Sequence, residues 1–166
     1  RGREPHFSMK GNTMRNTIMT LTLLAASTFA APAFAEEFEI KMLNKGENGA
    51  MVFEPDFVKA MPGDTIKFVP ADKGHNVETI KGMLPEGIEA VKTKFNDEYV
   101  LTAETEGVYG IKCSPHYGMG MIALISIGEP VNLEEAKAVK QKGKAKARFA
   151  DAFAKLEGAV EAPASN

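Results

Sequence analysis

The sequence predicts an all-β domain, an antiparallel sandwich or barrel, followed by two C-terminal α-helices. Short runs of strand-forming residues recur between residues 38 and 128 at intervals of roughly 10 to 15 residues, punctuated by Gly and Pro. After Pro130 the composition changes to Ala, Lys and Glu. With 166 residues, 44% hydrophobic and 25% charged, the chain has the composition of one globular domain and not of a collagen-like, disordered or disulfide-stapled protein.

Five runs are predicted to be strands: residues 38–43, 64–69, 99–102, 108–112 and 122–127. The first two alternate apolar and polar side chains, so each should bury one face. The last is β-branched and apolar, as expected of a central strand. Pro62-Gly63 and Glu106-Gly107 supply turns between them.

The Ala/Lys/Glu-rich segment predicts two helices that pack against the strands. Asn132 is expected to cap the first through about Lys142, because the next residues place acidic side chains near the positive end of the helix dipole. A second helix over residues 144–156 would align three apolar side chains on one stripe: Phe149, Phe153 and Leu156. Fraying is expected from Pro163 onward.

The N-terminal segment is predicted to be an export signal. Arg15 precedes an apolar run over residues 18–26, and the small-x-small sequence Ala33-Phe34-Ala35 precedes Glu36. The apolar run is shorter than the roughly 20 residues that span a bilayer. We therefore expect cleavage after about Ala35 and a periplasmic protein whose mature chain does not insert into a membrane.

The expected organisation is an upstream segment with the signal over residues 1–35, a β-sandwich over 36–129 and a helical extension over 130–166. Residues 36–166 contain 16 basic and 21 acidic side chains, a net charge of −5 against −2 for the whole chain. Binding nucleic acid calls for a dominant basic face, so this balance argues against nucleic-acid partners. We expect a monomer.

The chemistry-bearing residues concentrate in one loop and one upstream dipeptide. The loop, residues 113–121, reads CSPHYGMGM and contains the only cysteine, which cannot form an internal disulfide. His75 lies upstream. One thiolate, two imidazoles and a thioether can bind a soft metal, and two His, one Cys and a weak axial Met form the coordination of a mononuclear electron-transfer copper site. Each residue taken alone is more often an inert thiol, a solvated histidine or a core methionine.

His75-Asn76 followed by CSPHYGMGM resembles the ligand signature of the cupredoxins, and the terminal helices make the chain most similar to the pseudoazurin branch. The resemblance implies a Greek-key cupredoxin-type β-sandwich and an electron carrier that is not an enzyme. It implies one type 1 copper, with His75, Cys113 and His116 as equatorial ligands and Met121 as the axial ligand. The implied partners are periplasmic reductases, typically a nitrite reductase, and a cytochrome-type donor.

Residues beside the ligands are expected to orient them from outside the coordination sphere. By the resemblance, Asn76 ties the two ligand segments together, with Ser114 as its partner. Pro115 has no backbone N–H, which leaves the Asn76 amide as the main candidate donor to the Cys113 sulfur.

The expected route for electrons is the ring of His116, which lies on the loop between two strands. The resemblance implies an apolar patch around this ring formed by Met51, Met119 and Pro115. It also implies a surrounding ring of lysines that docks acidic partners: Lys45, Lys73, Lys92, Lys112 and Lys144.

Two other functions use the same residues. An exported zinc protein could bind its ion with the Cys and His ligands, although zinc gains little from a thioether. A hydrolase could use Cys113 as nucleophile and His116 or His75 as base, although no third orienting group is evident.

Overall fold

The computed structural model describes Gly2 and residues 35–161. The expected export signal, apart from Ala35, and the expected fraying after Pro163 lie outside the described residues. In the part of the chain that is described, no helix is both long and apolar enough to cross a membrane.

The described residues form two four-stranded sheets. The first has the order β2-β1-β4-β6, and its strands are β1 (Glu37–Gly46), β2 (Gly49–Glu54), β4 (Thr65–Val69) and β6 (Tyr99–Thr102). The second has the order β3-β8-β7-β5, with β3 (Phe57–Ala60), β5 (Glu78–Thr79), β7 (Gly107–Lys112) and β8 (Ile122–Ile127). Each sheet includes one parallel pair, β1 with β4 and β3 with β8, so the sheets are mixed and not purely antiparallel as expected.

All five predicted strands are present, and three further strands were not predicted. β2 has no alternating pattern, and β3 and β5 have only four and two residues, which is too short for alternation to identify a strand. β5 exists because its residues pair with the end of β7, and such pairing depends on residues far apart in the sequence.

The core between the sheets is formed by the alternating side chains that the strand patterns predicted. Ile40, Ile66 and Phe68 are fully buried in the first sheet, and Phe68 meets Phe53 edge to face with ring centroids 5.7 Å apart. Burying each such side chain contributes about 1.5–3 kcal/mol. Cys113 and Met121 belong to this same core cluster.

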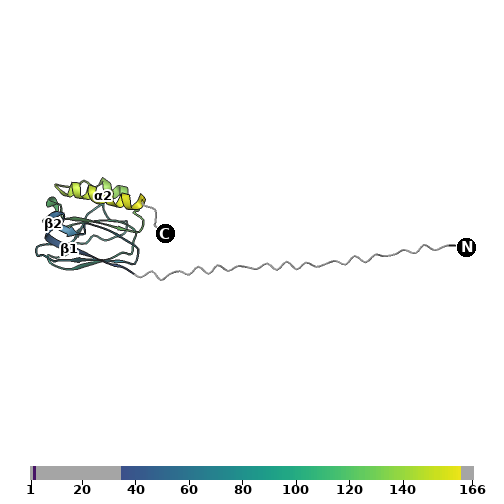
Figure 1. Cartoon of the computed structure of the whole chain (residues 1–166), viewed down its shortest axis with the longest axis horizontal. Helices are drawn as coiled ribbons and strands as arrows, with labels where there is room; N and C mark the ends of the chain where they lie inside the picture. Colours follow the sequence, from purple (N-terminus) through teal and green to yellow (C-terminus); the bar gives the residue numbers. More distant parts are fainter. Residues whose placement is uncertain (1, 3–34, 162–166) are drawn as a thin grey trace. The chain divides into compact units, whose positions relative to one another are not determined.

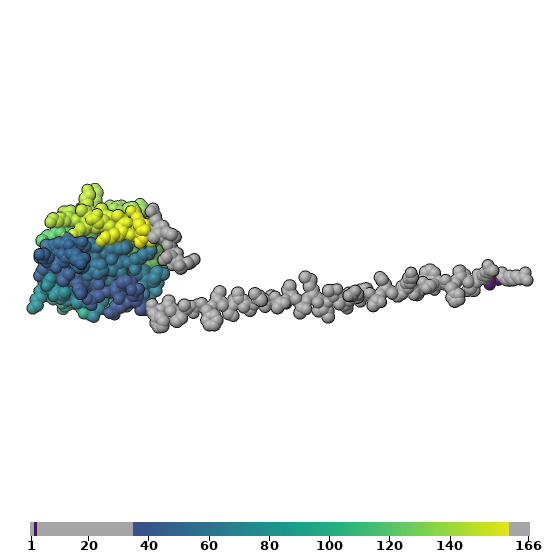
Figure 2. Space-filling model, viewed as in Figure 1, coloured from purple at the N-terminus to yellow at the C-terminus, as the bar shows by residue number. Residues whose placement is uncertain are grey.

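Two helices cover the outer face of the second sheet (Figure 1), and the C-terminal helical residues, in yellow, form one side of the molecular surface (Figure 2). These are α1 (Leu133–Ala138) and α2 (Ala145–Glu161), and the stripe of Phe149, Phe153 and Leu156 is buried as predicted. β8 is buried at every position because alternate residues face the helices and the sandwich interior.

Asn132 lies at the N-cap position of α1 as expected, but the prediction that its side chain caps the helix is wrong. Its side chain makes no capping hydrogen bond, and instead it accepts from the Val108 backbone N–H at 2.6 Å and donates to the Val108 carbonyl at 2.9 Å. Asn132 thus joins α1 to β7, and the helix ends at Ala138, earlier than the expected end near Lys142.

Candidate metal centre

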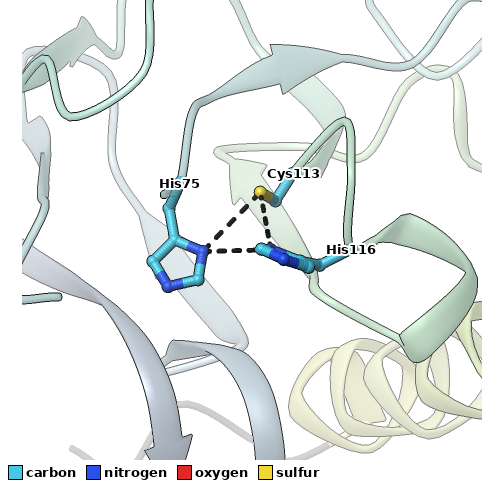
Figure 3. Close-up of side chains that lie close together, drawn as sticks. All are labelled: His75, Cys113 and His116. Atoms are coloured by element: carbon cyan, nitrogen blue, oxygen red, sulfur yellow. Dashed lines mark hydrogen bonds between the residues drawn. The ribbon is translucent and has the colours of Figure 1, made fainter. Parts of the chain in front are cut away.

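Three metal-binding side chains converge where the ends of β5, β7 and β8 meet (Figure 3). The Nδ1 atoms of His75 and His116 lie 3.2 Å apart, and the Cys113 Sγ lies 3.8 Å from the first and 3.5 Å from the second. Cys113 follows β7 and His116 lies on the loop to β8, whereas His75 comes from the segment between β4 and β5. The structure therefore brings together three residues from two distant parts of the sequence.

His75 is fully buried and its ring orientation is set by a hydrogen bond. Its Nε2 lies 3.1 Å from the Asn44 side-chain oxygen, which can only accept, so Nε2 bears the proton. Nδ1 is therefore free to bind a metal, an arrangement typical of metal-ligating histidines. Burial, followed by the nearby His116, lowers the pKa of His75 and favours the neutral ring that coordination requires.

Cys113 is buried at the end of β7. Its backbone N–H donates to the Met121 carbonyl at 3.0 Å, which closes the loop that contains the other ligands. Burial raises the pKa of the Cys113 thiol, while hydrogen bonds from the Asn76 and His116 backbone amides oppose this rise. A cation between the two rings would favour the thiolate at this position.

A tight turn places His116 and Met121 beside the cysteine. The short 3-10 helix η1 (Tyr117–Met119) ends at Gly120, whose φ of 96° lies in the left-handed region that glycine adopts without strain. The His116 carbonyl accepts from the Met121 amide at 3.1 Å. His116 is partly exposed, and Met121 is fully buried in the core cluster of Cys113.

The donor set fits a first-row metal ion. Separations of 3.2–3.8 Å between donor atoms match ligands placed around one ion at about 2.0–2.3 Å. The Nδ1 lone pair of His75 points at the other two donor atoms, from which it can accept a hydrogen bond only when the Cys113 Sγ or the His116 Nδ1 carries a proton. A cation at their centre satisfies it, and two imidazoles with one thiolate suit copper or zinc.

Asn76 and Ser114 connect the two ligand segments. The Asn76 side chain donates to the Ser114 hydroxyl at 3.0 Å and accepts from the Ser114 backbone N–H at 2.9 Å. Asn76 is buried, and it also donates to the Thr93 carbonyl at 3.4 Å. These contacts hold the residues after His75 and Cys113 in a fixed relation.

The residues expected at the docking surface differ in exposure and in their partners. Met119 is 45% exposed, Pro115 is exposed and Met51 is partly buried. Lys45, Lys73 and Lys144 are exposed, whereas Lys92 and Lys112 both form ion pairs with Glu78 at 3.2 Å.

Sequence reasoning missed Asn44, Glu78 and Arg148. The Arg148 guanidinium on α2 donates to the carbonyls of Gly120 at 2.8 Å, Asn48 at 2.9 Å and Met51 at 3.3 Å, so it joins the helix to the loop and to the β1–β2 turn. One signal was available: Arg148 is the only arginine in a Lys-rich C-terminal segment. An arginine can serve several carbonyls at once because it has five donors.

The model of the copper-binding proteins of the plastocyanin/azurin family matches residues 40–128, which include all four expected ligands and both sheets except the first three residues of β1. The chain belongs to this plastocyanin/azurin family. Copper, the cofactor expected from the sequence, is confirmed by this match together with the donor cluster. The expected cupredoxin sandwich with two C-terminal helices is also confirmed.

Within the plastocyanin/azurin family, the chain is similar to several pseudoazurins. The pseudoazurin of Paracoccus pantotrophus is 56% identical over 126 residues, which cover 75% of this chain and 87% of that protein. The crystal structure of pseudoazurin from Methylobacterium extorquens AM1 superposes with a TM-score of 0.70 at 52% identity, covering 72% of this chain and 98% of the other. Pseudoazurin from Hyphomicrobium denitrificans gives a TM-score of 0.69 at 50% identity, with 72% and 97% covered. Membership of this family makes the chain a copper electron-transfer protein.

Proposed function

We propose that this protein carries single electrons in the periplasm, cycles one copper between Cu(II) and Cu(I), and delivers electrons to a nitrite reductase or similar reductase. A cytochrome-type protein is the proposed donor. The observation that carries the proposal is the closure of the donor cluster: His75 and Cys113 are 0% exposed, and of the three residues only His116 is partly exposed. A catalytic metal needs a position that a substrate can reach. We therefore propose an electron carrier with no enzymatic activity of its own.

The proposed ligands are His75, Cys113, His116 and Met121. The first three present their donor atoms to one another. Support for Met121 comes from its complete burial in the cluster of Cys113 and from two backbone hydrogen bonds that bind it to Cys113 and His116. Its thioether would suit a weak contact with a soft metal ion.

When bound, copper supplies a one-electron change of oxidation state. The chain's own contribution is to hold the donors still and to keep water away from the thiolate. Asn44 fixes the His75 ring, and the Asn76–Ser114 pair links the two ligand segments. We propose that Asn76, Ser114 and Pro115 orient the ligands from outside the coordination sphere, because orientation of this kind governs how well a ligand binds its metal.

We propose that partners dock around the partly exposed His116 ring. Met51, Met119 and Pro115 would supply the apolar part of this surface, and the five lysines expected from the sequence would attract an acidic partner despite the net charge of −5 of residues 36–166. Electrostatic steering of this kind raises association rates by roughly 10- to 1000-fold and weakens with salt. A small interface suits a monomeric carrier that must release its partner.

The site is tested by the absorption spectrum of the protein purified from the periplasm, with copper added. We expect intense visible Cu–thiolate absorption that disappears on one-electron reduction and returns on oxidation. Cys113→Ser should lack this absorption. A colourless wild-type protein after oxidation would support the zinc alternative, and rapid iodoacetamide labelling of Cys113 in the metal-loaded protein would support the hydrolase.

The docking surface is tested by reversing charges. Lys45→Glu with Lys73→Glu should slow reduction of a copper nitrite reductase about 10-fold or more at low salt and flatten the salt dependence. Lys59→Glu, on β3, is the matched control and should have a small effect. Unchanged rates in the double variant would remove the docking proposal while leaving the copper site intact.

A further inference from the structure

Glu78 lies between two of the lysines expected to dock partners. It is the first residue of β5, and it pairs across the sheet with Lys112 of β7 on one side and forms an isolated β-bridge with Lys92 on the other. Directly opposed residues place their side chains on the same face, which suits opposite charges. Both Nζ atoms lie 3.2 Å from the Glu78 carboxylate, whose side chain is only 20% exposed.

The same carboxylate contacts the loop of residues 113–121, which contains Cys113 and His116. Glu78 accepts a hydrogen bond from the Ser114 hydroxyl. The Ser114 oxygen in turn accepts from Asn76, and Ser114 directly follows Cys113. A connected series of contacts thus runs from the exposed Lys92 and the partly buried Lys112 through one carboxylate to the residue beside the proposed thiolate ligand.

Glu78 is charged and its charge reaches the sulfur. Burial alone would raise the pKa of Glu78, but the hydrogen bond from Ser114 and the two lysines outweigh it and lower the pKa. The negative charge of Glu78 contributes to the raised pKa of Cys113. The two lysine ammonium groups offset the negative charge of the carboxylate, so removing them strengthens the interaction of this charge with the Ser114 hydroxyl.

We propose that Glu78 couples docking to electron release. Carboxylates of an acidic partner draw Lys92 and Lys112 away from Glu78. The negative charge of Glu78 then interacts more strongly with Ser114 and stabilises the oxidised form of the copper site. This inference rests on the proposed function. One electron leaves the reduced site and enters the partner's acceptor, and no bond is made or broken. The two lysines therefore attract the partner, and in its absence they offset the charge of Glu78. When a partner binds the lysines, the copper site becomes a stronger reductant.

The coupling is measured by redox titration of the isolated copper protein. Glu78→Gln should raise the ratio of reduced to oxidised protein at a fixed applied potential by about 3- to 10-fold, because it removes a negative charge near the site. Lys92→Gln with Lys112→Gln should lower this ratio. The decisive comparison is the same lysine pair changed in the Glu78→Gln background, where the effect should be at least about threefold smaller. If Glu78 did not respond to the lysines, the lysine substitutions would change the ratio by the same factor with and without Glu78. Equal factors in the two backgrounds would therefore overturn the coupling.

A second arm replaces the partner with poly-L-glutamate at low salt. The probe should shift wild-type protein toward the oxidised form, and the Glu78→Gln variant several-fold less. Glu157→Gln is the matched control. Glu157, on α2, also forms an ion pair with a lysine, Lys137 at 2.6 Å. It should respond to the probe as wild type does, and an equal response in Glu78→Gln would contradict the proposal.

A metal-free measurement separates this inference from the copper site. In the apo protein, changing the lysine pair should move the backbone amide resonance of Ser114 when Glu78 is present and not in the Glu78→Gln background. An unmoved resonance with Glu78 present overturns the coupling. A wild-type protein without Cu–thiolate absorption would instead contradict the proposed function, so the two failures are distinguishable.

Discussion

The two histidines of the metal centre are held in opposite ways. His75 is closed to solvent and its second ring nitrogen is tied to Asn44, whereas His116 is partly exposed on a tight turn between β7 and β8. Both present Nδ1 to the same point. The comparison teaches that one ligand is fixed by the interior of the sandwich, while the other combines metal binding with access to the surface.

The largest expected effect comes from deleting each ring in turn. His75→Gly and His116→Gly should both lose the visible Cu–thiolate absorption. Added imidazole should restore it in His116→Gly, because that ring borders solvent, and should fail in His75→Gly, whose ring is buried. Titration of imidazole followed by absorption measures the difference. Equal restoration in both variants would break the comparison.

A smaller effect is expected from removing the partner of the buried ring. Asn44→Ala takes away the oxygen that accepts the Nε2 proton of His75, so copper affinity should fall by about 10- to 100-fold. Asn44→Asp keeps an acceptor and should retain most of the affinity. Competition with a chelator of known affinity provides the measurement, and an alanine variant that binds copper as tightly as wild type would show that the ring needs no such support.

The loop that contains the partly exposed His116 is held instead by α2, through Arg148. Arg148→Met removes three hydrogen bonds to backbone carbonyls, including that of Gly120, and should lower the free energy of unfolding by about 1–3 kcal/mol. Lys146→Met, at an exposed position of the same helix, should change it by less than about 0.5 kcal/mol. Urea unfolding of the metal-free proteins compares the two, and equal losses would mean that Arg148 acts only as helix surface.

The smallest effect on the site is expected at the opposite end of β4, where Asp64 precedes the strand. Its carboxylate accepts from the backbone amides of Glu36 and Met61, both at 2.7 Å, and the first of these contacts is the main reason that the pKa of Asp64 is lowered. Its stabilising contribution is therefore full above the ordinary pKa near 3.8 and is lost as pH falls through the lower, folded-state pKa.

Asp64→Asn should accordingly lower stability at pH 6, and the difference from wild type should narrow below about pH 4. Its copper spectrum should stay unchanged, since the contacts lie away from both histidines. Unfolding at several pH values measures the first expectation. A difference that widens toward low pH would contradict the sign derived from the pKa.

The sequence predicts the metal-binding residues better than the residues that orient them, because most of the former are close together in the sequence and the latter are not. Cys113, His116 and Met121 lie on one short loop, so their spacing alone indicates a common ion. Asn44 and Glu78 act through strand register and chain reversal, which bring together residues far apart in the sequence. Glu78 lies on a strand of two residues whose existence depends on pairing with β7.

The fold shows the same division between local and distant information. Alternation predicted the long strands and the helix stripe, because burial of one face imposes a period on the sequence. The role of Asn132 was missed because a capping residue and a residue that bonds to a neighbouring strand look alike in sequence. In the structure the strand backbone of Val108 takes both hydrogen bonds of that side chain.

β7 and β8, the strands on either side of the loop of residues 113–121, also limit how far this loop can deform. β7 and β8 are neighbours joined through six register pairs, and β8 is buried on both faces. Spreading the ends of the loop would require opening the middle of a sheet and loosening a close-packed interior. We therefore expect a change of oxidation state to meet a scaffold with the stiffness of the whole sandwich, and the energy of reorganising the ligands to be low.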